Sequence, residues 1–178
     1  MIKQYSKQSV YDAALERLKF IFNSFENIFV SFSGGKDSAL LLNMTLDYRN
    51  KHYPNKRIGV FHQDFEAQYS LTSEYVERTF KRLESENVDL YWVCLPMATR
   101  TALSNYEMFW YPWDDKHPEL WVRPMPEHPY VINLENNPIT TYRYRMHQED
   151  LAKQFGRWYR LAHDGKPTVC LLGMRADE

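Results

Sequence analysis

Apolar runs alternate with segments of helical periodicity along the first half of the sequence. Three runs are short and rich in β-formers: Ile28–Phe32, Arg57–Phe61 and Val88–Leu95. Between them, Ser38–Lys51 and Leu71–Glu84 place apolar residues at helical spacing. This alternation of strand and helix predicts right-handed crossovers and a parallel sheet that is covered on both faces.

Two further helices and one further strand complete the expected fold. Helical periodicity marks Ser9–Phe25 and Gln148–Ala162, and a last apolar run covers Thr168–Leu172. If this fourth strand crosses back to the other side of the first, the strand order is 3-2-1-4. A ligand crevice then forms where the first and fourth strands diverge. We therefore expect a doubly wound, three-layer α/β/α domain.

The periodicity breaks down in residues 97–146. Most of the nine prolines fall there, together with Trp110, Trp113 and Trp121. The aromatic content argues against disorder, because such rings bury large areas. We expect a single domain over residues 1–178 with an irregular insertion that packs as a long loop, or alternatively forms a lid or partner surface. The sequence stops directly after a strand, so we expect a C-terminally truncated fragment.

The composition excludes several classes of protein. The net charge is −1, which argues against strong direct nucleic-acid binding. Cys94 and Cys170 lie in apolar runs, so we expect both side chains to be buried as small hydrophobic groups. They lack a Cys-x-x-Cys spacing, so the sequence indicates no dedicated metal site. No apolar run is long enough for a membrane span and no signal peptide is visible, so a cytoplasmic location is predicted.

The stretch Ser33-Gly-Gly-Lys-Asp-Ser38 joins the first strand to a helix. Backbone N–H groups at a helix N-terminus lack partners, and Gly34 and Gly35 let an anion approach them closely. Ser33 and Ser38 add hydroxyl groups and Lys36 adds a cation, so a phosphate or pyrophosphate site is predicted. The alternative is a tight turn in which Ser38 only caps the helix. The spacing matches neither the Walker A loop nor the dinucleotide fingerprint.

This stretch resembles the PP-loop of the adenine nucleotide alpha-hydrolase superfamily, which includes ATP pyrophosphatases and phosphoadenylyl-sulfate (PAPS) reductases. Four further segments resemble the PAPS reductase-like branch and a subgroup often encoded beside a ParB-like protein: Phe61–Asp64, Trp92–Pro96, Trp121–Pro126 and Gly173–Arg175 with Glu178. The resemblance implies a fold of the HUP, PP-loop type. It also implies ATP or PAPS as ligand and Mg²⁺ as a cofactor.

The candidate nucleotide-binding residues are Ser33, Gly34, Gly35, Lys36, Asp37, Ser38, Asp64, Gly173 and Arg175. Among them, Lys36, Asp37 and Arg175 are the catalytic candidates, with Lys36 and Arg175 offsetting phosphate charge. Asp37 caps or orients the helix, or binds Mg²⁺. Asp64 either reaches the nucleotide or a metal, or forms a turn. The strand order predicts that Arg175 and Gly173 lie across the crevice from Gly35.

The sequence is compatible with three functions. The first is ATP cleavage between the α- and β-phosphates, with adenylation of an acceptor and release of pyrophosphate. The second is a sulfonucleotide reductase of the PAPS type, although neither cysteine has the setting of a reactive thiol. The third is a non-catalytic nucleotide sensor that acts with a ParB-like partner. Four arginines either line the acceptor side or are surface charges: Arg100, Arg123, Arg143 and Arg145.

Overall fold

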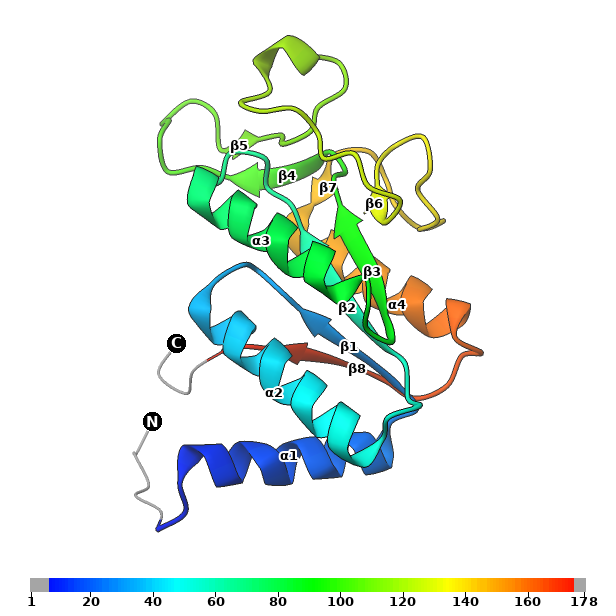
Figure 1. The fold of residues 1–178 in the computed structure, drawn as a ribbon. Helices are drawn as coiled ribbons and strands as arrows, with labels where there is room; N and C mark the ends of the chain where they lie inside the picture. Colours follow the sequence, from blue (N-terminus) through cyan, green and yellow to red (C-terminus); the bar gives the residue numbers. More distant parts are fainter. Residues whose placement is uncertain (1–6, 175–178) are drawn as a thin grey trace.

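The structure, a computed structural model, describes residues 7–174, and its centre is a five-stranded parallel sheet (Figure 1). The strands are β1 (Asn27–Ser31), β2 (Ile58–Gln63), β3 (Val88–Val93), β6 (Val131–Ile132) and β8 (Thr168–Leu172). Their order is β6-β3-β2-β1-β8, and every neighbouring pair is parallel. The predicted order 3-2-1-4 is therefore confirmed for β3, β2, β1 and β8.

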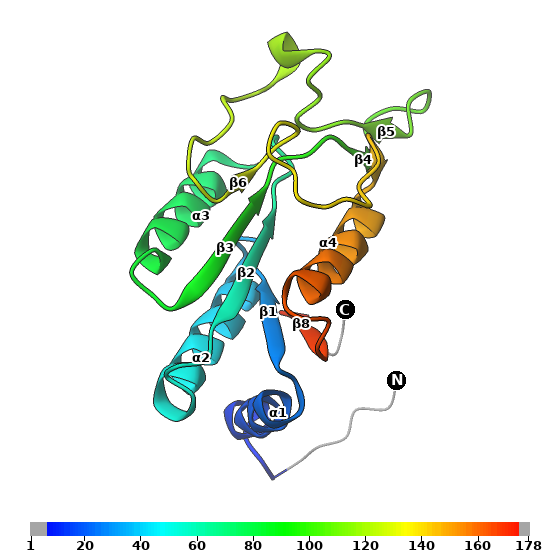
Figure 2. The ribbon, with the colours of Figure 1, turned by 90° about the vertical axis from the view of Figure 1, so that its right-hand side faces the viewer.

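Helices cover both faces of this sheet and give the three expected layers. The helices are α1 (Val10–Ser24), α2 (Lys36–His52), α3 (Ser70–Leu83), α4 (Gln148–Ala162) and a 3₁₀ turn, η1 (Pro118–Leu120). In Figure 2, α2 and α3 lie on one side of the strands and α4 lies on the other. The doubly wound α/β/α architecture is thus confirmed.

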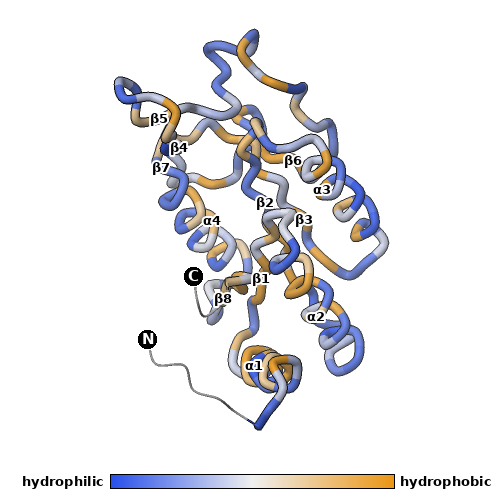
Figure 3. Tube along the Cα trace, turned by 90° about the vertical axis from the view of Figure 1, so that its left-hand side faces the viewer, coloured by the Kyte–Doolittle hydropathy of each residue, from blue (hydrophilic) through white to orange (hydrophobic). Residues whose placement is uncertain are grey.

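The core divides into two clusters because successive strand residues point to opposite faces. On one face, Ile28 and Val30 of β1 pack in a cluster with buried residues of α1, α2 and α3. On the other face, Phe29 packs with Phe155 and Tyr159 of α4. In Figure 3, hydrophobic residues gather along the inner strands, and the outer turns of α2 and α3 are hydrophilic.

The segment 97–146 is more ordered than its sequence suggests. It contains β4 (Met97–Arg100) and β5 (Phe109–Trp110), which form a small second sheet with β7 (Met146–His147). The same segment also contributes β6 to the edge of the main sheet, beside β3. The insertion is therefore largely irregular, as expected, but it includes the short strands β4, β5 and β6, which the sequence did not indicate. Figure 1 shows it at one end of the molecule, beyond β3.

The two cysteines occupy different environments. Cys94 is buried, and desolvation followed by the nearby charge of Asp64 raises the pKa of its thiol well above the usual value. Cys170 is exposed on the edge strand β8, so the expectation of a buried side chain was wrong there. Within residues 7–174, no helix combines the length and apolar character that crossing a membrane requires.

Candidate functional site

The turn between β1 and α2 has a backbone that requires glycine. Gly34 has φ +81°, in the left-handed region that residues with a side chain rarely adopt. A Cβ at this position would lie 2.8 Å from Val76 Cγ2 and 3.0 Å from Thr72 Cγ2, both on α3. The turn is therefore held close to α3, and the second position of the Ser33–Ser38 loop admits no side chain without strain.

The two serines of the loop hydrogen-bond within it. The Ser38 hydroxyl donates to Gly35 O at 2.9 Å, accepts from Ser33 N at 3.2 Å and lies 3.0 Å from Ser33 Oγ. Gly35 N in turn donates to Ser33 Oγ at 3.3 Å. Ser38 is buried and lies inside α2, whose N-cap is Gly35, so Ser38 does not cap the helix. Both hydroxyls therefore fix the shape of the loop.

Four of the six backbone donors of the Ser33–Ser38 loop have no acceptor among the described residues. In the part of the chain that the structure describes, the N–H groups of Gly34, Lys36, Asp37 and Ser38 donate no hydrogen bond within the protein. The last three open the 17-residue helix α2, where the helix dipole favours negative charge. Lys36 is exposed beside them. This arrangement suits an anionic group such as a phosphate.

Asp37 lies in the first turn of α2, not at its N-cap. The predicted capping role was therefore wrong, because Gly35 occupies that position and no side chain caps the helix. The Asp37 carboxylate is half-buried and makes no hydrogen bond or ion pair with residues 7–174. It remains available to orient the loop or to bind a cation.

Gly173, directly after β8, lies against the same loop. A Cβ on Gly173 would come within 2.7 Å of Ser38 N and 2.8 Å of both Asp37 C and Asp37 O. The neighbouring strands β1 and β8 therefore end together, at the position where the strand order changes direction. Arg175, the catalytic candidate two residues further on, lies outside the described residues, as does Glu178.

Asp64 is buried at the end of β2, and its carboxylate is fully engaged. It accepts hydrogen bonds from Trp92 Nε1 at 2.6 Å, from Glu66 N at 2.7 Å, and from Arg123 Nη2 at 2.6 and 2.7 Å. The side chain has no exposed surface. These contacts assign Asp64 to the attachment of the insertion and remove it from the groups that are open to a ligand.

Glu66 is a second buried acid that the sequence analysis did not single out. Its two carboxylate oxygens accept hydrogen bonds from Trp113 N at 2.7 Å and Val122 N at 2.9 Å. Arg123 Nε also donates to Glu66 O at 2.9 Å, and its guanidinium lies 4.8 Å from the ring of Trp113. The available signal was the spacing Asp-x-Glu directly after a strand, which places two acids at one turn.

His62 connects β2 to the residue that precedes the loop. Its Nδ1 donates to Phe32 O at 2.7 Å, and Phe32 N donates to Phe61 O at 2.8 Å. Burial lowers the pKa of His62, and this effect exceeds the opposing influence of Asp64 and of the hydrogen bond. The imidazole is therefore neutral at physiological pH and holds the end of β1 in register with β2.

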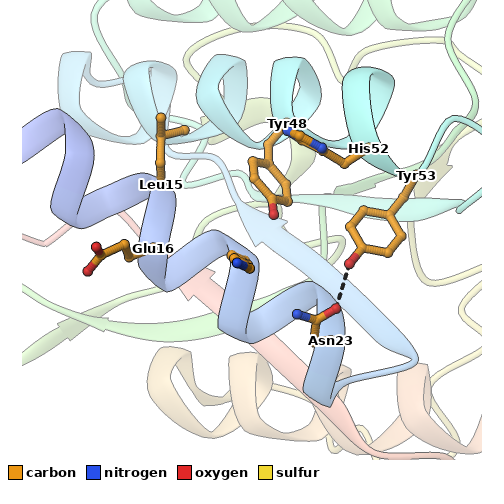
Figure 4. A pocket seen from close by; sticks show the side chains of 7 residues that line it. Leu15, Glu16, Asn23, Tyr48, His52 and Tyr53 are labelled. Atoms are coloured by element: carbon orange, nitrogen blue, oxygen red, sulfur yellow. Dashed lines mark hydrogen bonds between the residues drawn. The ribbon is translucent and has the colours of Figure 1, made fainter.

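Two cavities lie away from the Ser33–Ser38 loop. One, of about 550 Å³, lies between α1 and the end of α2, where Tyr53 Oη donates to Asn23 Oδ1 at 2.6 Å (Figure 4). The other, of about 680 Å³, lies in the insertion. No loop residue lines either of them. Among residues 7–174, no three His, Cys, Asp or Glu side chains gather as metal ligands.

The four candidate arginines separate into two pairs. Arg100 and Arg143 are exposed. Arg123 and Arg145 form ion pairs with the buried carboxylates of Asp64 and Asp114. Of the four, Arg145 lines the cavity in the insertion.

Comparison with known proteins identifies the domain that contains the Ser33–Ser38 loop. Residues 27–117, which run from β1 to beyond β5, match the phosphoadenosine phosphosulfate reductase domain. The chain is also 32% identical over 171 residues to the uncharacterized protein YbdN of Escherichia coli (strain K12). That match covers 96% of this chain and 39% of the relative, so the chain spans well under half of the relative's length. The chain belongs to the phosphoadenosine phosphosulfate reductase domain family, within the adenine nucleotide alpha-hydrolase superfamily.

Proposed function

We propose that this chain binds ATP at the Ser33–Ser38 loop and cleaves it between the α- and β-phosphates. One observation carries the proposal: the ends of β1 and β8 lie side by side, next to backbone N–H groups that have no acceptor in residues 7–174. Gly173, after β8, contacts the first turn of α2 there. An acceptor oxygen would form a bond to the α-phosphorus while the bond to the β-phosphate oxygen breaks. The electron pair leaves with pyrophosphate, and the acceptor is adenylated. With water as acceptor, the products are AMP and pyrophosphate.

The residues of the loop act by positioning and charge. The N–H groups of Lys36, Asp37 and Ser38 point along a helix dipole and would hold phosphate oxygens. The Lys36 ammonium would offset the charge that develops on the departing pyrophosphate. Because the two serine hydroxyls already fix the loop, these donors are preorganised before the nucleotide arrives.

The residues present also fit a Mg²⁺ ion bound with the nucleotide. Mg²⁺ is commonly held by one or two carboxylates together with phosphates and water. The Asp37 carboxylate, in the first turn of α2 and without a protein partner in residues 7–174, supplies one such ligand. When bound, the ion would neutralise phosphate charge, while Lys36 and the loop N–H groups hold the phosphate oxygens.

Labelled ATP tests this proposal directly. ATP carrying a label on the α-phosphate should yield labelled AMP and pyrophosphate when incubated with the chain and Mg²⁺. The Lys36→Ala variant should lower this rate by at least about a hundredfold, since one preorganised cationic contact is lost. Lys51→Ala is the matched control, because it removes an exposed lysine from the other end of α2 and should leave the rate unchanged. Equal rates in the two variants would contradict the proposal.

Two alternative functions predict different experimental results. A sulfonucleotide reductase would release sulfite from PAPS with a thiol donor. Against it, burial raises the pKa of the Cys94 thiol well above its usual value, so this thiol is not ionised at neutral pH. A nucleotide sensor would bind ATP tightly without turnover. A ParB-like partner for such a sensor and a cytoplasmic location both stay predictions.

A further inference from the structure

The cavity in the insertion has aromatic walls. Its volume is about 680 Å³, and the half-buried rings of Trp110, Tyr111 and Trp121 line it. Trp121 is held in place, since its Nε1 donates to Asp114 O at 3.0 Å and its ring packs edge-on against Trp113. Rings held at fixed positions around a space of this size form a site for a small organic molecule.

The charged groups of this cavity are predominantly negative. Three acidic residues, Glu66, Glu107 and Asp114, and one arginine, Arg145, line the cavity. Their formal charges sum to −2 when His117 is counted as neutral. Glu66 and Asp114 are 4% and 7% exposed and form the buried part of the wall. Burial alone would raise the pKa of Asp114, but hydrogen bonds from Tyr144, Arg145 and the Lys116 N–H lower it overall. Asp114 is therefore charged at neutral pH.

One carboxylate of the cavity is free. The Glu107 side chain is exposed and makes no hydrogen bond or ion pair with residues 7–174, whereas Asp114 is paired with Arg145. The guanidinium of Arg145 also lies 4.2 Å from the ring of Tyr111, so the wall already holds one cation against an aromatic face. Aromatic faces and an unpaired carboxylate around one cavity together favour a positively charged ligand.

The cavity is connected to the nucleotide loop by a short segment of chain. Glu66 and Ala67 line the cavity, and α3 begins three residues later at Ser70. Thr72 and Val76 of α3 then enclose Gly34. One continuous segment, which runs from the end of β2 into α3, therefore supplies part of the cavity wall and the residues that contact Gly34.

We propose that this cavity binds an organic cation that carries a quaternary or protonated amine. The amine lies among Trp110, Tyr111 and Trp121, with Glu107 as its counter-charge. That the cation belongs to the acceptor of the adenylation reaction rests on the proposed function. The cation site itself does not rest on it.

Choline and its uncharged isostere, 3,3-dimethylbutan-1-ol, test the charge preference. Binding of each compound is measured by isothermal titration calorimetry without nucleotide. Choline should bind at least about tenfold more tightly than 3,3-dimethylbutan-1-ol, which corresponds to a difference in binding free energy of about 1.4 kcal/mol. Glu107→Gln should remove most of this difference. Glu135→Gln makes the same change at an exposed position of the insertion outside the cavity and should leave it intact. Trp110→Leu should weaken choline binding while thermal unfolding confirms a folded chain.

The outcomes separate this proposal from the nucleotide proposal. Equal binding of choline and its isostere, no binding of choline, or an unchanged Glu107→Gln variant would each overturn the cation site. ATP cleavage with water as acceptor is measured without choline and should be unchanged in the control variant Glu135→Gln, which lies outside the cavity. Loss of ATP cleavage in Lys36→Ala with choline binding intact would support both proposals. If the wild-type chain binds choline but does not cleave ATP, the cation site is supported. The same result would refute the assignment of the cation to the acceptor of an adenylation reaction.

Discussion

The Gly173→Ala variant should bind ATP about ten- to a hundredfold more weakly than the wild-type chain. The added Cβ would lie 2.7 Å from Ser38 N and 2.8 Å from Asp37 C and Asp37 O. All three are backbone atoms of the first turn of α2, so no side-chain rotation relieves the overlap and the turn has to shift. Losing one charge-assisted hydrogen bond of about 1.5–3 kcal/mol to a phosphate accounts for the expected decrease.

A second glycine supplies the control for this experiment. A Cβ on Gly156, inside α4, would lie 3.7 Å from Phe29 Cζ, an ordinary van der Waals contact. Gly156→Ala should therefore bind ATP as the wild type does, and should raise the free energy of unfolding by about 0.5–1 kcal/mol through helix propensity. ATP affinity is measured by calorimetry, and stability by urea denaturation. Wild-type affinity in Gly173→Ala would show that the contact with β8 does not shape the nucleotide site.

The sequence was sufficient for four of the five strands of the main sheet because their signals are local. Apolar runs bounded by Gly or Pro marked β1, β2, β3 and β8, and the crossover rules then gave their order. The two-residue strand β6 has no detectable period of its own, and it is positioned by pairing with β3. Its placement therefore depends on tertiary contacts that no short window of sequence contains.

The candidate site was predicted unevenly for the same reason. The loop residues Ser33–Ser38 and Gly173 are brought together by strand order, which the sequence pattern predicts. The partner of Asp64 is Arg123, 59 residues away and inside an aperiodic segment, so nothing near Asp64 indicated an ion pair. Asp64, at the carboxyl end of a strand, was accordingly interpreted as a ligand contact or a turn former, and its ion pair with the insertion was not foreseen.

Arg123→Met should lower the free energy of unfolding by about 3–5 kcal/mol. Methionine retains much of the packing against Trp113 but leaves the fully buried carboxylate of Asp64 without its counter-charge. The ion pair between Arg57 and Asp89 is largely exposed, so the matched Arg57→Met variant should cost about 1 kcal/mol or less. Urea denaturation of both variants measures the difference, and an Arg123→Met variant as stable as Arg57→Met would contradict a structural role for the buried pair.

Hydrogen exchange should show where the stability is lost. Arg123 connects the insertion to Asp64 and to Glu66 O, at the end of β2. In Arg123→Met, faster exchange should begin at the N–H groups of Trp113 and Val122, which donate to the Glu66 carboxylate. The N–H groups of β1 should keep their protection until global unfolding, because they belong to ladders with β2 and β8 on both sides. Equal loss of protection in β1 and at Trp113 would mean that the insertion and the sheet unfold as one unit.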